Sequence, residues 1–332
     1  MQVNELFKQS NTILLDGGMG TMLQAAGLKL GARPEELNIT DPALIEGIHA
    51  QYAAAGSRIV NANTFGASAH KLAGSTYTLE QIITAGIENC KRACAPYGAL
   101  TALDVGPLGE LLEPSGTLAF EDAVAEYARI VKAGEAAGAD LIFFETYTDL
   151  YELKAALLAA KENTRLPILA SMSFEAGGRT FTGCTVESFA ATARGLGADA
   201  VGINCSLGPK EIFPMAKRLA EAVPGNFPVF VKPNAGLPRA DGSGYDITPQ
   251  LFVLQMKPYR ELHLFAAGGC CGTTPEFIKL LNGTFAGCTP GRPAHRMPSV
   301  LCTPVDTVTV DGITVVGERI NPTGKKRFQQ AL

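Results

Sequence analysis

Three cysteines follow the ends of two apolar runs. Cys205 closes "AVGINCS", and the adjacent pair Cys270 and Cys271 follows "LHLFAAGG". A disulfide between neighbouring residues would strain the geometry of the bond. Three thiolates around one point suit zinc, which takes cysteine sulfur at about 2.3 Å in tetrahedral geometry. The glycines that flank the pair allow a sharp turn, so both sulfurs can face one ion.

A zinc ion with three protein ligands keeps its fourth position open, as catalytic zinc sites do. Three thiolates overcompensate the charge of the metal, so the ion is a poor activator of water. It suits a substrate thiol better, because a zinc-bound thiol is deprotonated whereas a free thiol at neutral pH is mostly protonated. The sequence therefore predicts alkylation of a bound thiol, with no catalytic residue beyond the zinc site. Buried thiols without metal are the plainer alternative.

A parallel β-structure must position these cysteines. Apolar runs alternate with helical stretches, and each run turns polar or glycine-rich at its end, as strands buried on both faces do. Eight β-then-α units predict an α/β fold, a (β/α)8 TIM barrel, whose active site lies at the carboxyl ends of the strands. A doubly wound open sheet is the alternative, but no G-x-G-x-x-G or Walker A loop is present. The eight runs are residues 12–18, 58–65, 99–107, 140–146, 167–175, 200–206, 228–236 and 262–269.

Helix-start signals lie between the runs. Asp41 has the sequence context of an N-cap. Thr78 with Gln81 has the spacing of a capping box, and so has Thr273 with Glu276 after the eighth run. We expect helices to begin at these three places.

Polar side chains at the ends of the runs are the candidate site residues, because those ends converge on one face of a barrel. Glu145 could pair with a substrate ammonium or cap the next turn. Asp16 leads the glycine-rich "DGGMGT", whose N–H groups could hold a carboxylate or form an ordinary turn. Asn234 in "KPNAG" could lend an oxygen to the zinc until substrate arrives, or serve only the turn. The full set of candidates is Asp16, Asn61, Asn63, Asp104, Glu145, Ser173, Asn204, Cys205, Asn234, Cys270 and Cys271.

The other five cysteines carry weaker signals. Cys90 and Cys94 continue an apolar helical stripe, which predicts core packing. Cys184 follows the fifth run and could approach the site. Cys288 and Cys302 flank a proline-rich stretch without ligand spacing.

The composition restricts the class of protein. The chain has 332 residues, a formal net charge of -4 and eight cysteines. This charge leaves no electrostatic footprint for nucleic acid, and no apolar run is long enough for a membrane span. The N-terminus lacks the basic start and apolar centre of a signal peptide. We expect a cytoplasmic protein with reduced thiols that binds neither nucleic acid nor membrane.

The composition of the sequence changes near Pro290. "PGRPAHRMPSVLCTP" reads as a linker, and "DTVTVDGITVVGERINPTGKKRFQQAL" begins a strand signal that stops abruptly. We expect one domain over residues 1–290, followed over residues 291–332 by a linker and the truncated start of a second module. The chain would then be a piece of a longer gene product.

Five motifs, in order, resemble the zinc-dependent homocysteine S-methyltransferase family. They are "DGGMGT", "FFET", "GINCS", "KPNAG" and "GGCCGTTPEFI", spread over about residues 10 to 290. The resemblance implies a (β/α)8 barrel in which Cys205, Cys270 and Cys271 bind zinc, and the zinc binds the thiolate of homocysteine. It implies that Glu145 and the Asp16 loop hold the amino-acid end. The substrate-binding residues expected are Asp16, Gly17, Gly18, Met19, Glu145 and Asn234.

Within the family, the chain looks most like the N-terminal, homocysteine-binding module of cobalamin-dependent methionine synthases. "VGERINPTGKKRF" is similar to the start of the folate-binding barrel that follows in those enzymes. The resemblance implies that methylcobalamin, carried by a module absent from this chain, donates the methyl group, with cobalamin- and folate-binding modules as partners. Gly66 stands in a segment where members that use betaine tend to carry a tyrosine, which weighs against that donor.

Two alternatives to this function remain. A stand-alone homocysteine S-methyltransferase could take the methyl group from a sulfonium donor such as S-methylmethionine. A non-catalytic zinc- or thiol-binding protein could use the same cysteines with the fourth position closed.

Overall fold

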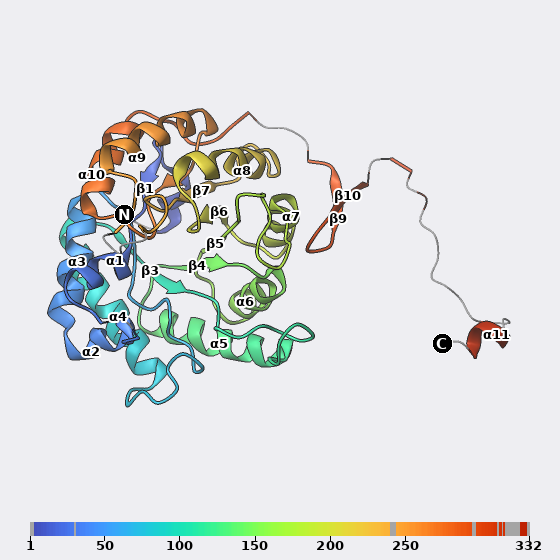
Figure 1. The fold of residues 1–332 in the computed structure, drawn as a ribbon, viewed down its shortest axis with the longest axis horizontal. Helices are drawn as coiled ribbons and strands as arrows, with labels where there is room; N and C mark the ends of the chain where they lie inside the picture. The colour runs from blue at the N-terminus through green and yellow to red at the C-terminus, as the bar shows by residue number, and fades with distance from the viewer. Residues whose placement is uncertain are drawn as a thin grey trace.

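The structure is a computed structural model that describes residues 3–29, 31–239, 244–293, 297–310, 312, 313, 315 and 326–330. Eight parallel strands form a central ring, and helices surround them (Figure 1). The strands follow one another in sequence order around the ring. Leu14 in the first strand bridges to Ser57, just before the second, so the sheet closes on itself. The predicted (β/α)8 TIM barrel is confirmed.

The strands are short and lie within the predicted runs, except that one extends a residue further to Tyr147. The candidate residues lie in the last positions of the strands or in the loops that follow them, at the carboxyl end of the barrel. The strands are β1 (Ile13–Leu14), β2 (Ile59–Asn61), β3 (Leu100–Val105), β4 (Leu141–Tyr147), β5 (Ile168–Met172), β6 (Ala200–Asn204), β7 (Val229–Lys232) and β8 (Ala266–Ala267).

The outer layer is helical. Its α-helices are α1 (Met19–Ala25), α2 (Leu37–Thr40), α3 (Pro42–Ala54), α4 (Leu79–Cys94), α5 (Phe120–Ala136), α6 (Leu150–Asn163), α7 (Val186–Gly195), α8 (Pro209–Glu221), α9 (Pro249–Met256) and α10 (Pro275–Phe285). The 3-10 turns are η1 (Val3–Lys8), η2 (Pro34–Glu36), η3 (Ala95–Tyr97) and η4 (Lys257–Leu262). None of the described helices is long and apolar enough to cross a bilayer.

Two of the three predicted helix starts are confirmed. Asp41 caps α3 by accepting a hydrogen bond from the N–H of Leu44, and Thr78 with Gln81 forms the complete capping box of α4. The third was placed one residue too early, because α10 has Thr274 as its N-cap and no side-chain capping bond.

Thr273 does not cap a helix because its hydroxyl is used elsewhere. Its Oγ1 donates to the carbonyl of Cys270 at 2.6 Å and accepts from the N–H of Gly18 at 3.2 Å. The side chain thus ties the turn after β8 to the loop after β1, which positions the candidate site rather than starting the helix.

The interior of the barrel is an apolar layer made by alternate residues of the strands, as the period of two requires. At the amino end of the strands, η1 packs against this layer, and the ring centroids of Phe7 and Phe265 are 5.2 Å apart. The buried members of this layer are Leu6, Ile13, Leu15, Ile59, Leu100, Ala102, Leu141, Phe143, Leu169, Ala200, Phe230, Phe265 and Ala266. The next inward position along β2, β3, β4 and β7 is polar or charged, so this layer is the floor of the site.

Beyond the barrel, two antiparallel strands form a hairpin beside α7 (Figure 1). They are β9 (Ser299–Cys302) and β10 (Thr307–Val310), and the short helix α11 (Lys326–Gln329) follows. The hairpin is anchored by a hydrogen bond from the N–H of Thr185 to the carbonyl of Pro304. The stretch predicted to be a linker therefore contains a strand. The boundary at residue 290 stays a prediction, and residues 316–325 of the folate-like motif lie outside the described residues.

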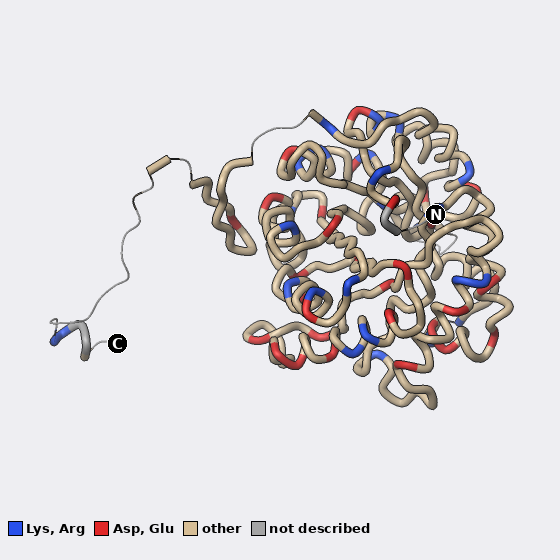
Figure 2. Tube along the Cα trace, turned by 180° about the vertical axis from the view of Figure 1, so that it is seen from behind, with Lys and Arg blue, Asp and Glu red and all other residues tan. Residues whose placement is uncertain are grey.

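Charges of both signs are interspersed over the barrel (Figure 2).

Candidate metal and substrate site

Cys205, Cys270 and Cys271 come together at the carboxyl end of the barrel. Their three Sγ atoms lie within 4.8 Å of one another, and Cys205 Sγ is 3.9 Å from Cys271 Sγ. Two sulfurs held by one tetrahedral zinc at 2.3 Å would be about 3.8 Å apart. The spacing and the donor set therefore fit a single zinc ion. Among the described residues, no other group of three such side chains has this spacing.

The end of β7 holds the two cysteine loops together. The N–H of Cys205 donates to the carbonyl of Lys232 at 3.1 Å, and the N–H of Cys270 donates to the carbonyl of Pro233 at 2.9 Å. Strands six and eight are not neighbours, so the strand between them supplies both backbone acceptors. The cysteines converge because β7 lies between them.

Unusual backbone conformations aim the sulfurs. Cys205 has a φ of 62°, in the left-handed region that non-glycine residues rarely adopt. Gly272, after the pair, has a φ of 79°, and a Cβ there would lie 2.3 Å from the ring of Tyr245. The glycine is thus required for the turn and for the close approach of Tyr245.

The thiols influence one another strongly. Hydrogen bonds from Cys205 and then Cys270 lower the pKa of Cys271 to about 3, against the opposing effect of burial. A thiol whose pKa is lowered by its neighbours gives up its proton readily to a cation, which suits the cluster to a metal ion.

Asn234 lies between the two cysteine loops. Its N–H donates to the carbonyl of Leu207, beyond Cys205, and the next N–H, of Ala235, donates to the carbonyl of Cys271. The side-chain Oδ1 of Asn234 is buried and has no hydrogen-bond partner in the described part of the chain. The backbone of Asn234 therefore ties the two cysteine loops together, while its side-chain oxygen has no described partner, which is unusual for a buried polar atom.

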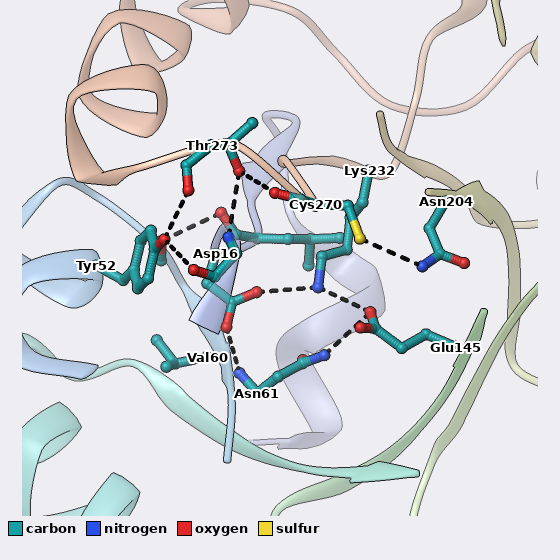
Figure 3. A network of polar contacts seen from close by, with 12 residues as sticks. Asp16, Tyr52, Val60, Asn61, Glu145, Asn204, Lys232, Cys270 and Thr273 are labelled. Atoms are coloured by element: carbon teal, nitrogen blue, oxygen red, sulfur yellow. Dashed lines mark hydrogen bonds and ion pairs between the residues drawn. The ribbon is translucent and has the colours of Figure 1, made fainter. Parts of the chain in front are cut away.

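A buried ionic network lies at the other end of the site (Figure 3). Lys232 Nζ is 3.1 Å from Asp16 Oδ1 and 2.9 Å from Glu145 Oε2, and its side chain is 2% exposed. Asn61 completes the network, donating through its backbone N–H to Asp16 Oδ2 at 2.7 Å and through Nδ2 to Glu145 Oε2 at 3.3 Å. The Lys232 ammonium also stands 5.0 Å above the ring of Phe143, part of the apolar floor.

The network has more carboxyl groups than cations. Burial lowers the pKa of Lys232, but Asp16 and Glu145 more than reverse this effect and raise it well above the usual value. Burial raises the pKa of Glu145 to about 7 in spite of Lys232. Burial and the nearby Glu145 also hold the pKa of Asp104 well above its usual value. These carboxyl groups are thus partly protonated in the free site, and an incoming cation would favour their ionised form.

Both ends open into one cavity of about 320 Å³. Its walls include every expected substrate-binding residue except Asn234, and all three cysteines. Of the other candidates, Asn61, Asn63 and Asp104 line it, whereas Ser173 and Asn204 do not. The lining is Asp16, Gly17, Gly18, Met19, Gly20, Thr21, Gln24, Pro34, Glu35, Asn61, Asn63, Phe65, Asp104, Glu145, Thr146, Cys205, Lys232, Tyr245, Cys270 and Cys271.

Asn204 supports the wall from behind. Its Oδ1 accepts from the N–H of Thr146 at 2.9 Å and from Ser171 Oγ at 2.9 Å, and its Nδ2 lies 3.8 Å from Cys270 Sγ. Ser173 Oγ donates to the carbonyl of Asn204 at 2.8 Å. These two residues position β4, β5, β6 and the cysteine rather than meeting a ligand.

The sequence reasoning missed Lys232 and Tyr245. A signal for Lys232 was present, because it lies two positions after Phe230, an inward residue of β7, and must point inward as well. Tyr245 carried no signal, since it belongs to a loop far from any run.

The remaining cysteines lie outside the cluster. Cys90 and Cys94 are buried in the apolar core with their Sγ atoms 3.8 Å apart, as predicted. Cys184 is buried and does not line the cavity. Cys302 is exposed on the hairpin and Cys288 is buried in the core.

The comparisons with known proteins agree with this site. A sequence model of the homocysteine S-methyltransferase family matches residues 13–285. Methionine synthases of Mycobacterium tuberculosis and Mycobacterium leprae are each 32% identical, and each alignment covers 96% of this chain and 28% of the relative. The chain thus spans little more than a quarter of the length of these relatives.

Solved structures support the fold. The oxidised form of the homocysteine methyltransferase MmuM from Escherichia coli superposes with a TM-score of 0.72 at 24% identity, covering 85% of this chain and 98% of that one. Its metallated form gives a TM-score of 0.70 at the same identity, with 85% and 99% coverage.

Proposed function

Since the chain belongs to the homocysteine S-methyltransferase family, we propose that it binds the thiol of homocysteine at zinc held by Cys205, Cys270 and Cys271 and presents it for methylation to methionine. One observation carries this proposal: a single cavity has three sulfurs at one end and an excess of carboxyl groups at the other. Homocysteine has a thiol at one end and an ammonium at the other, so its two ends match the two ends of the cavity in chemistry. Bound zinc would keep the substrate thiol ionised at neutral pH.

The residues of the chain have separate tasks in this proposal. Asp16 and Glu145 supply negative charge for the ammonium, and Lys232 keeps their side chains in place. The loop of Gly17, Gly18 and Met19 leads into α1 and lines the cavity, and the first N–H groups of α1 have no acceptor within the helix. These groups suit the substrate carboxylate. Asn234 Oδ1 is the proposed fourth ligand in the absence of substrate.

We propose methylcobalamin, carried by another module, as the methyl donor, with cobalamin- and folate-binding modules as partners in a cytoplasmic enzyme. The chain covers only 28% of its methionine synthase relatives, so a donor module has a place outside it. At Gly66, a Cβ would lie 2.5 Å from Glu35 Oε1, so the tyrosine expected of a betaine user would require the Glu35 side chain to move. A sulfonium donor used by a stand-alone enzyme is the second candidate, because the alignment with the homocysteine methyltransferase MmuM covers 98% of that chain and leaves little of it for a donor module.

The donor assay separates these candidates. Zinc-loaded protein is incubated with homocysteine and either methylcobalamin or S-methylmethionine, and methionine is quantified by mass spectrometry. We expect methionine from methylcobalamin and none from the sulfonium, with Cys205→Ser inactive in both. Turnover with S-methylmethionine alone would replace the proposed donor, and no product from either would favour a non-catalytic thiol-binding protein.

A further inference from the structure

Among the described residues, one buried carboxyl oxygen on the cavity has neither a hydrogen bond nor an ion pair. Asp104 ends the inward-facing row of β3 and is 7% exposed. Its Oδ1 is fully buried and has no hydrogen-bond partner in the described part of the chain. The backbone of Asp104 exchanges hydrogen bonds with Thr64 Oγ1, at 2.8 and 3.1 Å, but these bonds leave the carboxyl group free. The side chain lines the cavity.

The two neighbouring carboxylates have polar partners. Asp16 meets Lys232 and the N–H of Asn61, and Glu145 meets Lys232 and the side chain of Asn61. Both contacts of Glu145 use Oε2, so its Oε1 is not committed to either of them. A buried polar atom without a partner is costly. Two acceptors on the cavity wall, Asp104 Oδ1 and Glu145 Oε1, are therefore available to a donor that arrives with the ligand.

We propose that Asp104 binds the ammonium of the substrate together with Glu145 and so makes the site selective for thiols that carry an amino group. The inference rests on the proposed function and adds to it a specificity residue. An ammonium has three N–H donors and can satisfy both free acceptors at once. It also brings a positive charge to three neighbouring carboxyl groups, of which Lys232 contacts only Asp16 and Glu145 among the described ion pairs.

A purely structural role for Asp104 makes a different prediction. A buried acid that only filled space would affect every ligand of the cavity alike. A residue that binds the ammonium affects only ligands that have one. The two roles separate when homocysteine is compared with 4-sulfanylbutanoate, which keeps the thiol and the carboxylate and lacks the amine.

The experiment measures the affinity of both thiols for the zinc-loaded chain by titration calorimetry. In Asp104→Asn, which keeps the shape and removes the charge, homocysteine should bind about 10- to 100-fold more weakly, the range of a charge-assisted hydrogen bond. Binding of 4-sulfanylbutanoate should change less than about threefold. The matched control is Glu152→Gln, another buried carboxyl, which is held by the N–H of Leu108 and the hydroxyl of Tyr127 outside the cavity. It should leave the ratio of the two affinities unchanged.

The outcomes are distinct. If Asp104→Asn keeps the wild-type preference for homocysteine, or weakens both thiols equally, the inference is wrong while the proposed function stands. If the wild-type chain binds neither thiol, the proposed function fails and the inference with it. Should the variant not fold, a crystal structure of the wild-type chain with zinc and homocysteine decides. An ammonium nitrogen within about 3.2 Å of Asp104 Oδ1 supports the inference, and one beyond about 4 Å overturns it.

Discussion

The two ends of the cavity are built differently. The sulfur end uses one residue type from two loops, with two of its three members adjacent in sequence. The charged end draws Asn61, Glu145 and Lys232 from three strands and Asp16 from the loop after β1. An adjacent pair of cysteines and a third cysteine at another strand end can be recognised in a sequence. A charge network whose members lie far apart in the chain can be recognised only in the closed barrel.

The largest effect is expected at the sulfur end. Cys205→Ser replaces a thiolate by a hydroxyl, a far weaker zinc ligand, so we expect zinc affinity to fall more than about 100-fold, beyond the loss seen for outer-shell partners. Competition with a chromophoric chelator measures this. Cys302→Ser, on the exposed hairpin, is the matched control and should bind zinc normally. Equal zinc affinity in both variants would contradict the three-sulfur site.

The charged end should respond through stability. Lys232→Met leaves two buried carboxylates without their cation, which costs about 3–5 kcal/mol of unfolding free energy. The deficit relative to wild type should shrink as the pH falls, because protonation removes the uncompensated charge. Urea unfolding at pH 8 and pH 6 measures both effects, with the exposed Lys154→Met as control. A deficit that does not depend on pH would mean that Lys232 acts by packing alone.

A backbone test sharpens the comparison at the sulfur end. Gly272→Ala places a Cβ at positive φ and 2.3 Å from the ring of Tyr245, so we expect a loss of about 2 kcal/mol in stability and weaker zinc binding. Gly283→Ala, in α10 with nothing within 4 Å of the added Cβ, should gain up to about 1 kcal/mol by helix propensity. If Gly272→Ala and Gly283→Ala change the thermal unfolding temperature alike, the turn at Gly272 does not require glycine.

The smallest effect concerns pH. With the pKa of Glu145 raised to about 7, the group loses its charge as the pH falls through that value, and the bound ammonium loses attraction. The ratio of homocysteine to 4-sulfanylbutanoate affinity should therefore drop by up to about tenfold from pH 8 to pH 6. The ratio cancels the ionisation of the thiol, common to both ligands. Glu145→Gln should make it independent of pH, and a slope that persists in this variant would assign the titration to another group.

The sequence was sufficient for the barrel and the sulfur end for physical reasons. Strands buried on both faces must be apolar, so all eight could be recognised, and Cys205 with the adjacent pair lies at two strand ends. The exact use of Thr273 could not be predicted, since capping-box spacing says nothing of a competing acceptor such as the carbonyl of Cys270. Lys232 was recognisable only by counting two positions on from Phe230. Contacts of loops, such as that of Tyr245, depend on tertiary packing and had no local signal.

The central claim is that the fourth ligand of zinc comes from the substrate. Zinc X-ray absorption on the loaded chain, with and without homocysteine, tests it directly. We predict three sulfur neighbours and one oxygen or nitrogen without substrate, and four sulfur neighbours with it. A sulfur count that stays at three when homocysteine is bound would contradict the account.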